Sequence, residues 1–257
     1  MSDAPISNPA CATSSASAYG KIRLYVGVDL TDGAGVEFSR DQTHYLVNVM
    51  REGVGARVLV FNGRDGEWSA EIVKAGKRSC MAELRQQTRD QDGVPDLHLL
   101  FAPVKKARLD FLVQKATELG VAAIRPVRTA RTNVARIKDE RMAANVIEAA
   151  EQCGRLTVPE VLGTLTLDQA LCEIGDRKIM FCDEGGDVAP AAQALSAQES
   201  GPWAVLIGPE GGFSDEERAM LHAHEGCVPV SLGPRIMRAD TAAIAALSLW
   251  QAALGDW

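Results

Sequence analysis

The sequence of 257 residues lacks a long hydrophobic run. Its longest mostly apolar stretch, 242–254, is interrupted by Ser248 and Gln251 and is too short to cross a bilayer. The chain does not begin with a basic patch followed by an apolar run, so we expect no secretory signal. These two absences predict a cytoplasmic protein with no membrane partner.

Paired cysteines are absent as well. None of the cysteines belongs to a C-x-x-C pattern, and no histidine stands at ligand spacing from any of them: Cys11, Cys80, Cys153, Cys172, Cys182 and Cys227. We therefore predict no zinc site or other metal site. Scattered cysteines of this kind are typical of a reducing cytosol, where they act as small buried hydrophobes.

Two nucleotide-binding fingerprints are also missing. The chain contains neither the G-x-G-x-x-G pattern of dinucleotide-binding folds nor a Walker A loop. A metabolite dehydrogenase is therefore disfavoured.

An overall excess of basic residues is lacking, which on its own argues against a nucleic-acid partner. The chain has 27 Lys and Arg against 34 Asp and Glu, for a net charge of −7. The balance is uneven, because residues 21–155 carry 22 basic and 18 acidic groups, whereas residues 156–257 carry 5 and 15. Such asymmetry is compatible with a polyanion partner and equally with a merely solvated acidic half.

The chain reads as a tail and two domains. Residues 1–20 are rich in Ser and Ala without periodicity and predict a disordered tail. Short β runs, turns at 62–66 and one helical segment at 41–51 predict a small β-barrel over residues 21–90. After a linker, strands and helices alternate over residues 96–257, which predicts an α/β domain with a mainly parallel sheet. The predicted strands there are 97–102, 121–127, 178–182, 203–207 and 228–232.

Two Gly-Pro loops follow predicted strands of this second domain. They are 207–213 (IGPEGGF) and 232–241 (LGPRIMRADT). Ligands bind at the carboxyl ends of strands in open α/β sheets, and glycines let a backbone approach a ligand closely. From the residues alone, the loops are either ligand loops or tight strand–helix turns.

The two loops resemble those of the RsmE family of ribosomal RNA methyltransferases. The resemblance includes 114–121 (QKATELGV), 148–155 (EAAEQCGR) and a segment from Arg40 through His44 to Arg51, and it spans roughly residues 23–254. The second loop departs mildly from the family pattern, with Met237 where Leu is usual and Asp240 where Glu is usual. Both residues keep the side-chain character.

The resemblance implies an α/β fold in which a SPOUT-type methyltransferase domain with a trefoil knot follows a PUA-like β-barrel. It further implies a homodimer that uses S-adenosylmethionine to methylate N3 of a uridine in 16S rRNA of the small ribosomal subunit, without a metal. Two alternatives stay open. One is a SPOUT methyltransferase acting on another RNA atom, such as a ribose 2′-O, and the other is a non-catalytic RNA-binding protein of ribosome assembly.

Within this resemblance, the two loops supply the candidate site. The residues expected to bind the cofactor are Ile207, Gly208, Gly211, Gly212, Leu232, Gly233, Ile236, Met237 and Thr241. Arg238 is the first candidate for holding the target nucleotide or its developing charge, and Glu210 is a candidate to orient the cofactor or accept a proton. Structural interpretations also remain open: Arg238 bonded to loop carbonyls, and Glu210 stabilising a helix N-terminus.

Six arginines are the candidate RNA contacts. They are Arg23, Arg40, Arg51, Arg131, Arg155 and Arg235. Arg131 belongs to a basic run suited to phosphates. The other members of this run are Arg125, Arg128 and Arg136, of which the first and last are interpreted as solvated. Arg155 lies four residues after Glu151, so a surface ion pair on one helix is its alternative.

Overall fold

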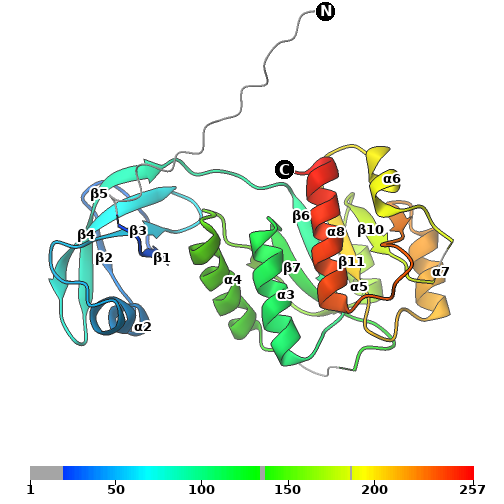
Figure 1. Ribbon diagram of the computed structural model, residues 1–257, viewed down its shortest axis with the longest axis horizontal. Coiled ribbons are helices and arrows are strands. Elements are labelled where there is room, and N and C mark those ends of the chain that lie inside the picture. Colours follow the sequence, from blue (N-terminus) through cyan, green and yellow to red (C-terminus); the bar gives the residue numbers. More distant parts are fainter. Residues whose placement is uncertain (1–19, 134–136, 186) are drawn as a thin grey trace, which may run out of the picture. The chain divides into compact units, whose positions relative to one another are not determined.

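The computed structural model describes residues 20–133, 137–185 and 187–257. The predicted tail, apart from Gly20, lies outside the described residues, as do Cys11 and Arg136. The chain divides into two compact units, one ending at Gln91 and one spanning Asp92–Trp257 (Figure 1).

The first unit is built on a five-stranded sheet with the strand order β1-β3-β4-β5-β2. Its strands are β1 (Arg23–Tyr25), β2 (Gly35–Glu37), β3 (Arg57–Phe61), β4 (Glu67–Ala75) and β5 (Cys80–Arg89). The pairs β3–β4, β4–β5 and β2–β5 are antiparallel, and β1 runs parallel to β3. The predicted helical segment at 41–51 is shorter and in two parts, α2 (Arg40–His44) and the π-helix η1 (Tyr45–Val49).

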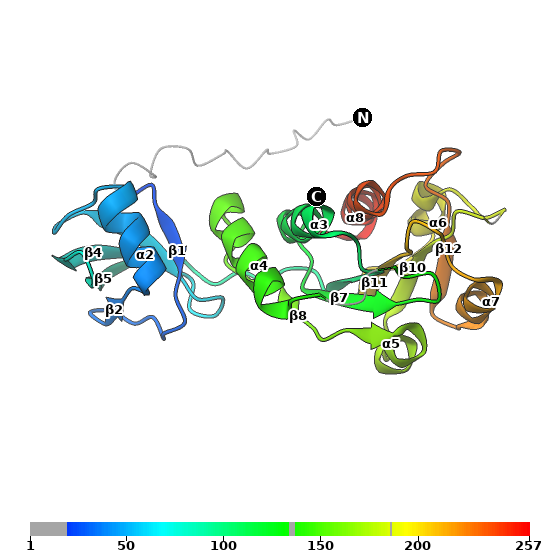
Figure 2. The ribbon, with the colours of Figure 1, turned by 90° about the horizontal axis from the view of Figure 1, so that it is seen from below.

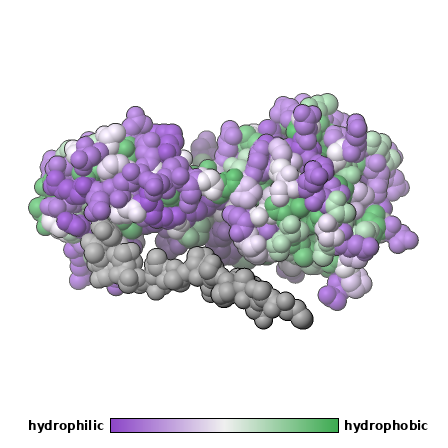
Figure 3. Space-filling view, turned by 90° about the horizontal axis from the view of Figure 1, so that it is seen from above, coloured by the Kyte–Doolittle hydropathy of each residue, from purple (hydrophilic) through white to green (hydrophobic). Residues whose placement is uncertain are grey.

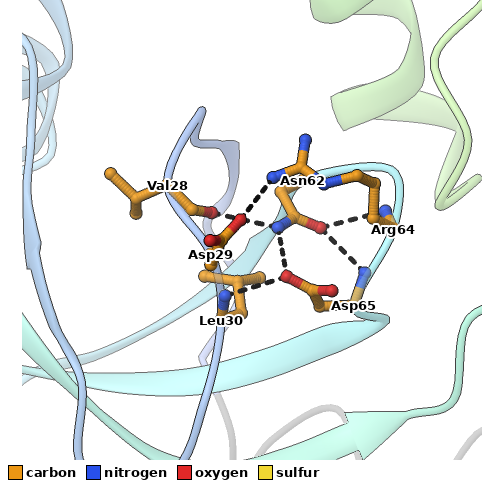
Figure 4. Close-up of polar contacts among 6 residues, drawn as sticks. All are labelled: Val28, Asp29, Leu30, Asn62, Arg64 and Asp65. Atoms are coloured by element: carbon orange, nitrogen blue, oxygen red, sulfur yellow. Dashed lines mark hydrogen bonds and ion pairs between the residues drawn. The ribbon is translucent and has the colours of Figure 1, made fainter.

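The turn between β3 and β4 is fixed by side chains rather than by backbone alone (Figure 4). The Oδ1 atom of Asn62 accepts hydrogen bonds from the backbone N–H groups of Arg64 and Asp65, each at 2.9 Å. The Asp65 carboxylate accepts from the Leu30 N–H at 2.9 Å and from the Asn62 amide at 2.6 Å. These bonds lower the pKa of Asp65, that from Leu30 contributing most. The hairpin is thereby tied to the segment 28–30.

The second unit contains a seven-stranded sheet in which every strand pairing is parallel, as the alternating pattern predicts. The strand order is β12-β10-β11-β6-β7-β8, with β9 also paired to β7. The strands are β6 (Leu97–Phe101), β7 (Ala123–Arg128), β8 (Glu160–Val161), β9 (Leu165–Thr166), β10 (Lys178–Cys182), β11 (Trp203–Ile207) and β12 (Cys227–Val230).

Helices cover both faces of this sheet (Figure 2). Their bounds are α3 (Lys106–Glu118), α4 (Asp139–Cys153), α5 (Leu167–Glu173), α6 (Ala191–Ser196), α7 (Asp215–Ala223) and α8 (Ala239–Leu254). Buried residues of α3, α4, α6 and α8 form one core with the sheet, and those of α5 and α7 form a second core on the opposite face. Alternate residues of β6 divide between the two cores, since Leu99 joins the first and Leu100 the second.

An ionic cluster lies at the amino edge of the same sheet. Arg177 Nη1 is 2.8 Å from Asp96 Oδ1, and His98 Nε2 lies 3.6 Å from that oxygen. Burial, together with the positive charge of Arg177, lowers the pKa of His98 to about 4. His98 is therefore neutral in the folded protein at pH 7.

We predict that His98 makes stability depend on pH between about 7 and 5. An unfolded histidine titrates at about pH 6.5, so over this range the unfolded state binds a proton that the folded state does not. The free energy of unfolding should thus fall by about 2 kcal/mol on acidification, as measured by urea unfolding at several pH values.

His98→Gln should remove this part of the slope, whereas the same change at the exposed His44 should leave it in place. An identical slope in wild type and His98→Gln would contradict the assignment.

Candidate functional site

A pocket opens at the carboxyl edge of the second unit's sheet. It encloses about 630 Å³, part of it open to solvent. Its wall comes from the segments that follow β10, β11 and β12, together with the start of α8. The lining residues are Cys182, Asp183, Glu184, Ile207, Gly208, Pro209, Glu210, Gly212, Phe213, Ser231, Leu232, Gly233, Arg235, Ile236, Met237, Ala239 and Ala242.

The loop 207–213 is shaped by its glycines. A Cβ on Gly208 would lie 2.6 Å from the Phe213 ring, so glycine is what allows that ring to pack there. Gly212 adopts a φ of +69°, donates its N–H to the Pro209 carbonyl at 2.9 Å, and leaves no room for a Cβ beside the Glu184 carboxylate. The turn leads into α7, whose first turn is closed by a capping box of Ser214 and Glu217.

Two arginines hold this loop from outside. Arg131 Nη1 donates to the Gly211 carbonyl at 2.8 Å, and Arg108 Nη1 lies 3.2 Å from Glu210 Oε1. Arg131, a candidate RNA contact, therefore stands beside the pocket. Glu210 lines the pocket and is paired with Arg108 of α3.

The loop that follows β12 forms the second wall. Gly233 has a φ of +105°, and the chain then presents Arg235, Ile236 and Met237 to the pocket before α8 begins. Ile236 of this wall is 87% exposed although it is apolar.

Most of the predicted cofactor-binding residues meet in this pocket. Those in its lining are Ile207, Gly208, Gly212, Leu232, Gly233, Ile236 and Met237. Gly211 and Thr241 are not part of the lining. Arg238 is the N-cap residue of α8, makes no side-chain capping bond, and is exposed between the lining residues Met237 and Ala239.

Residues 182–184 form the third wall of the pocket, and the sequence did not identify them as part of the site. The Asp183 side chain is only 2% exposed, and its carboxylate accepts hydrogen bonds from His222 Nε2 at 2.9 Å, from Arg218 Nη2 at 3.1 Å and from the Gly185 N–H at 3.1 Å. Burial alone raises the pKa of Asp183, but these bonds outweigh burial and hold that pKa below its ordinary value. An acidic pair directly after a predicted strand was the available signal.

Two candidate RNA arginines are bound within their own units. Arg155 donates to the carbonyls of Thr117 at 2.6 Å and Val121 at 2.9 Å, and burial lowers its pKa. Arg23 pairs with Glu67 at 2.6 Å and lies 3.8 Å above the Phe61 ring. Both side chains thus support the fold.

The other candidate RNA arginines are exposed: Arg40 and Arg51 in the first unit, and Arg131 and Arg235 in the second. Arg51 has a φ of +59°, a conformation that L-residues rarely adopt. In the part of the chain that the structure describes, no cluster of His, Cys, Asp or Glu is suited to hold a metal ion. None of the described helices is long and apolar enough to cross a membrane.

Each of the two units matches a model of a known protein family. A model described as an RNA methyltransferase domain matches residues 92–251, and one described as an RNA methyltransferase PUA domain matches residues 38–84. The chain is 30% identical to the ribosomal RNA small subunit methyltransferase E of Rickettsia conorii, covering 88% of this chain and 93% of that protein. It is 32% identical to the protein of the same name from a Synechocystis strain, covering 95% and 81%.

Solved structures agree with this family. The ribosomal RNA small subunit methyltransferase E of Neisseria gonorrhoeae, bound to S-adenosyl methionine, is 29% identical, with a TM-score of 0.83 over 93% of this chain and all of that chain. A Legionella pneumophila protein solved with bound cofactor SAM is 33% identical, with a TM-score of 0.86 over the same shares.

We predict that Gly212→Ala lowers the free energy of unfolding by about 1–2 kcal/mol, because an L-residue is strained at this positive φ and the Glu184 carboxylate must move away. Gly211→Ala is the matched control, since its Cβ would meet Arg131 only at an ordinary 3.6 Å. Urea unfolding of the two variants checks this. Equal losses at both positions would refute the assignment.

Proposed function

The chain belongs to the RNA methyltransferase family that includes the ribosomal RNA small subunit methyltransferases E, and from this premise we propose that it methylates N3 of a uridine in 16S rRNA of the small ribosomal subunit. S-adenosylmethionine is the methyl donor. One observation carries the proposal: both Gly-Pro loops of the sequence meet in one pocket at the sheet edge where α/β proteins bind ligands. Relatives with bound S-adenosylmethionine share this fold.

The pocket fits this cofactor in shape and in charge. Ile207, Leu232 and Met237 supply apolar surface for an adenine ring, and the glycine loops offer backbone donors and acceptors. The lining also contains three carboxylates, those of Asp183, Glu184 and Glu210, against the single guanidinium of Arg235. Arg218 and Arg108 pair with Asp183 and Glu210, so Glu184 is the lining carboxylate that we expect to face a sulfonium cation.

Transfer to uracil N3 requires that the N3–H proton leave, since the protonated nitrogen has no free lone pair. When bound, the cofactor supplies an electrophilic methyl group. The protein's part is to hold the base in line with that group and to stabilise the uracil anion as it develops. We assign this positive charge to Arg238 and to the lining residue Arg235. The proposed proton acceptor is Glu210, a lining carboxylate that also pairs with Arg108.

Exposed arginines carry the proposed RNA contacts. Arg131 and Arg235 flank the pocket, and Arg40 and Arg51 belong to the unit whose sequence matches the PUA model. Guanidinium groups bind phosphates without reading sequence, so these residues would position the RNA while the pocket selects the base. With ribosomal RNA as its partner, the enzyme is proposed to act in the cytoplasm.

We further propose a homodimer, which an apolar surface of the second unit supports. α8 carries one charged residue, Asp240, and its Ile244 and Leu249 are only partly buried. Phe111 of the neighbouring α3 is 43% exposed. Figure 3 shows hydrophobic residues on one face of this unit. A second copy would cover such a surface, and light scattering on the assayed sample measures the mass.

The proposed function predicts N3-methyluridine as the product. Purified protein, S-adenosylmethionine and either small ribosomal subunits or naked 16S rRNA should yield this nucleoside, as identified by mass spectrometry. Arg238→Ala should lower turnover at least 100-fold, the scale of removing one group that stabilises a transition-state anion.

Arg238→Ala should keep the wild-type melting temperature and bind S-adenosylmethionine, as measured by calorimetry. A methylated ribose would favour the 2′-O alternative. Absence of cofactor binding by the wild-type protein would favour the non-catalytic assembly factor. Unchanged turnover in the variant would remove Arg238 from the site.

We predict that Arg131→Ala weakens RNA binding and reduces the salt dependence of that binding by about one phosphate contact. Arg125→Ala is the matched control, because the Arg125 side chain is only 17% exposed and pairs with Glu173, whereas Arg131 is exposed. Fluorescence anisotropy with labelled RNA at several salt concentrations measures both slopes. An equal reduction in the salt dependence of RNA binding in the two variants would contradict a specific role for Arg131.

A further inference from the structure

Two clusters of the same composition lie at opposite edges of the parallel sheet in the second unit. Each joins one Asp, one Arg and one His. At the amino edge they are Asp96, Arg177 and His98. At the carboxyl edge they are Asp183, Arg218 and His222, and the aspartate of this cluster is buried and lines the pocket.

The carboxyl-edge cluster joins two walls of the pocket. Asp183 begins the segment after β10, whereas Arg218 and His222 lie on α7, the helix that follows the loop 207–213. The Glu184 carboxylate makes a second contact between the same two walls, because it packs against Gly212 of the loop 207–213. A third lies at Gly185, where a Cβ would be 2.5 Å from Arg218 Nη1.

Only the aspartate of this cluster is withdrawn from solvent, since 29% of the Arg218 side chain and 39% of the His222 side chain are exposed. A buried ion pair recovers its desolvation cost only when its polar atoms are fully satisfied. Here the Arg218 Nε atom is buried without a hydrogen-bond partner. What the geometry does show is that Arg218 and His222 fix the position of a buried carboxylate in the pocket wall.

We propose that Asp183, Arg218 and His222 form a positioning network that locks the third wall of the cofactor pocket to α7. Neither Arg218 nor His222 lines the pocket, so they act through Asp183 and the neighbouring Glu184 rather than on a reacting atom. The inference rests on the proposed function. It assigns cofactor affinity, rather than the chemical step, to residues outside the two loop motifs.

The decisive variant is His222→Phe. A phenyl ring keeps the edge-to-face contact with Phe181, now at 5.7 Å between ring centroids, and removes only the Nε2 bond to Asp183. We expect the Kd for S-adenosylmethionine to rise about fivefold, the scale of one hydrogen bond. The kcat at saturating cofactor should stay within about twofold, and His222→Gln, whose amide can donate again, should restore most of the affinity.

His98→Phe in the amino-edge cluster is the matched control, and it should leave the Kd unchanged even where it lowers the melting temperature. An unchanged Kd in His222→Phe, an equal rise in both variants, or a loss of kcat instead of affinity would each overturn the inference. Should His222→Phe fail to fold, Arg218→Lys, which keeps the charge but not the planar fork, is subject to the same criteria. A wild-type protein that binds no cofactor would instead overturn the proposed function.

Discussion

The burial of β11 on both faces is the constraint on which the second unit depends. All five of its residues are buried, alternating between the core beneath α3 and α8 and the core beneath α5 and α7. A strand covered on both sides cannot slip by one residue without exchanging its faces, so its register with β6 and β10 is fixed. The chain therefore leaves the sheet at one defined point, Gly208, and the pocket begins there.

Several charged side chains of this unit lie near the pocket that begins at Gly208. The Asp183 carboxylate forms an ion pair with Arg218, and the Glu210 carboxylate forms one with Arg108. The largely buried guanidinium group of Arg155 donates its hydrogen bonds to backbone carbonyls. A few guanidinium groups beside the pocket stay exposed. The proposed RNA contacts of this unit belong to them.

Periodicity and turn chemistry predicted the parallel sheet and both Gly-Pro loops, because those signals are local in sequence. The short helices α5 and α6, of seven and six residues, were not predicted, since so few residues carry little periodicity. The wall at 182–184 and the engagement of Arg23 with Glu67 depend on partners 35 to 44 residues away, which spacing does not reveal. The trefoil knot came from resemblance alone, and it stays a prediction.

The net charge of −7 sets a condition on how such an enzyme can bind RNA. A polyanion is repelled by the chain as a whole, so binding must come from local groups whose separate contributions are modest and weaken with salt. Exposed arginines occur in both units, at Arg40 and Arg51 and at Arg131 and Arg235. Contacts made together on one RNA raise the effective concentration at each remaining site, and a second chain would double their number. From this charge distribution we expect tighter binding to a structured ribosomal particle than to a short flexible RNA.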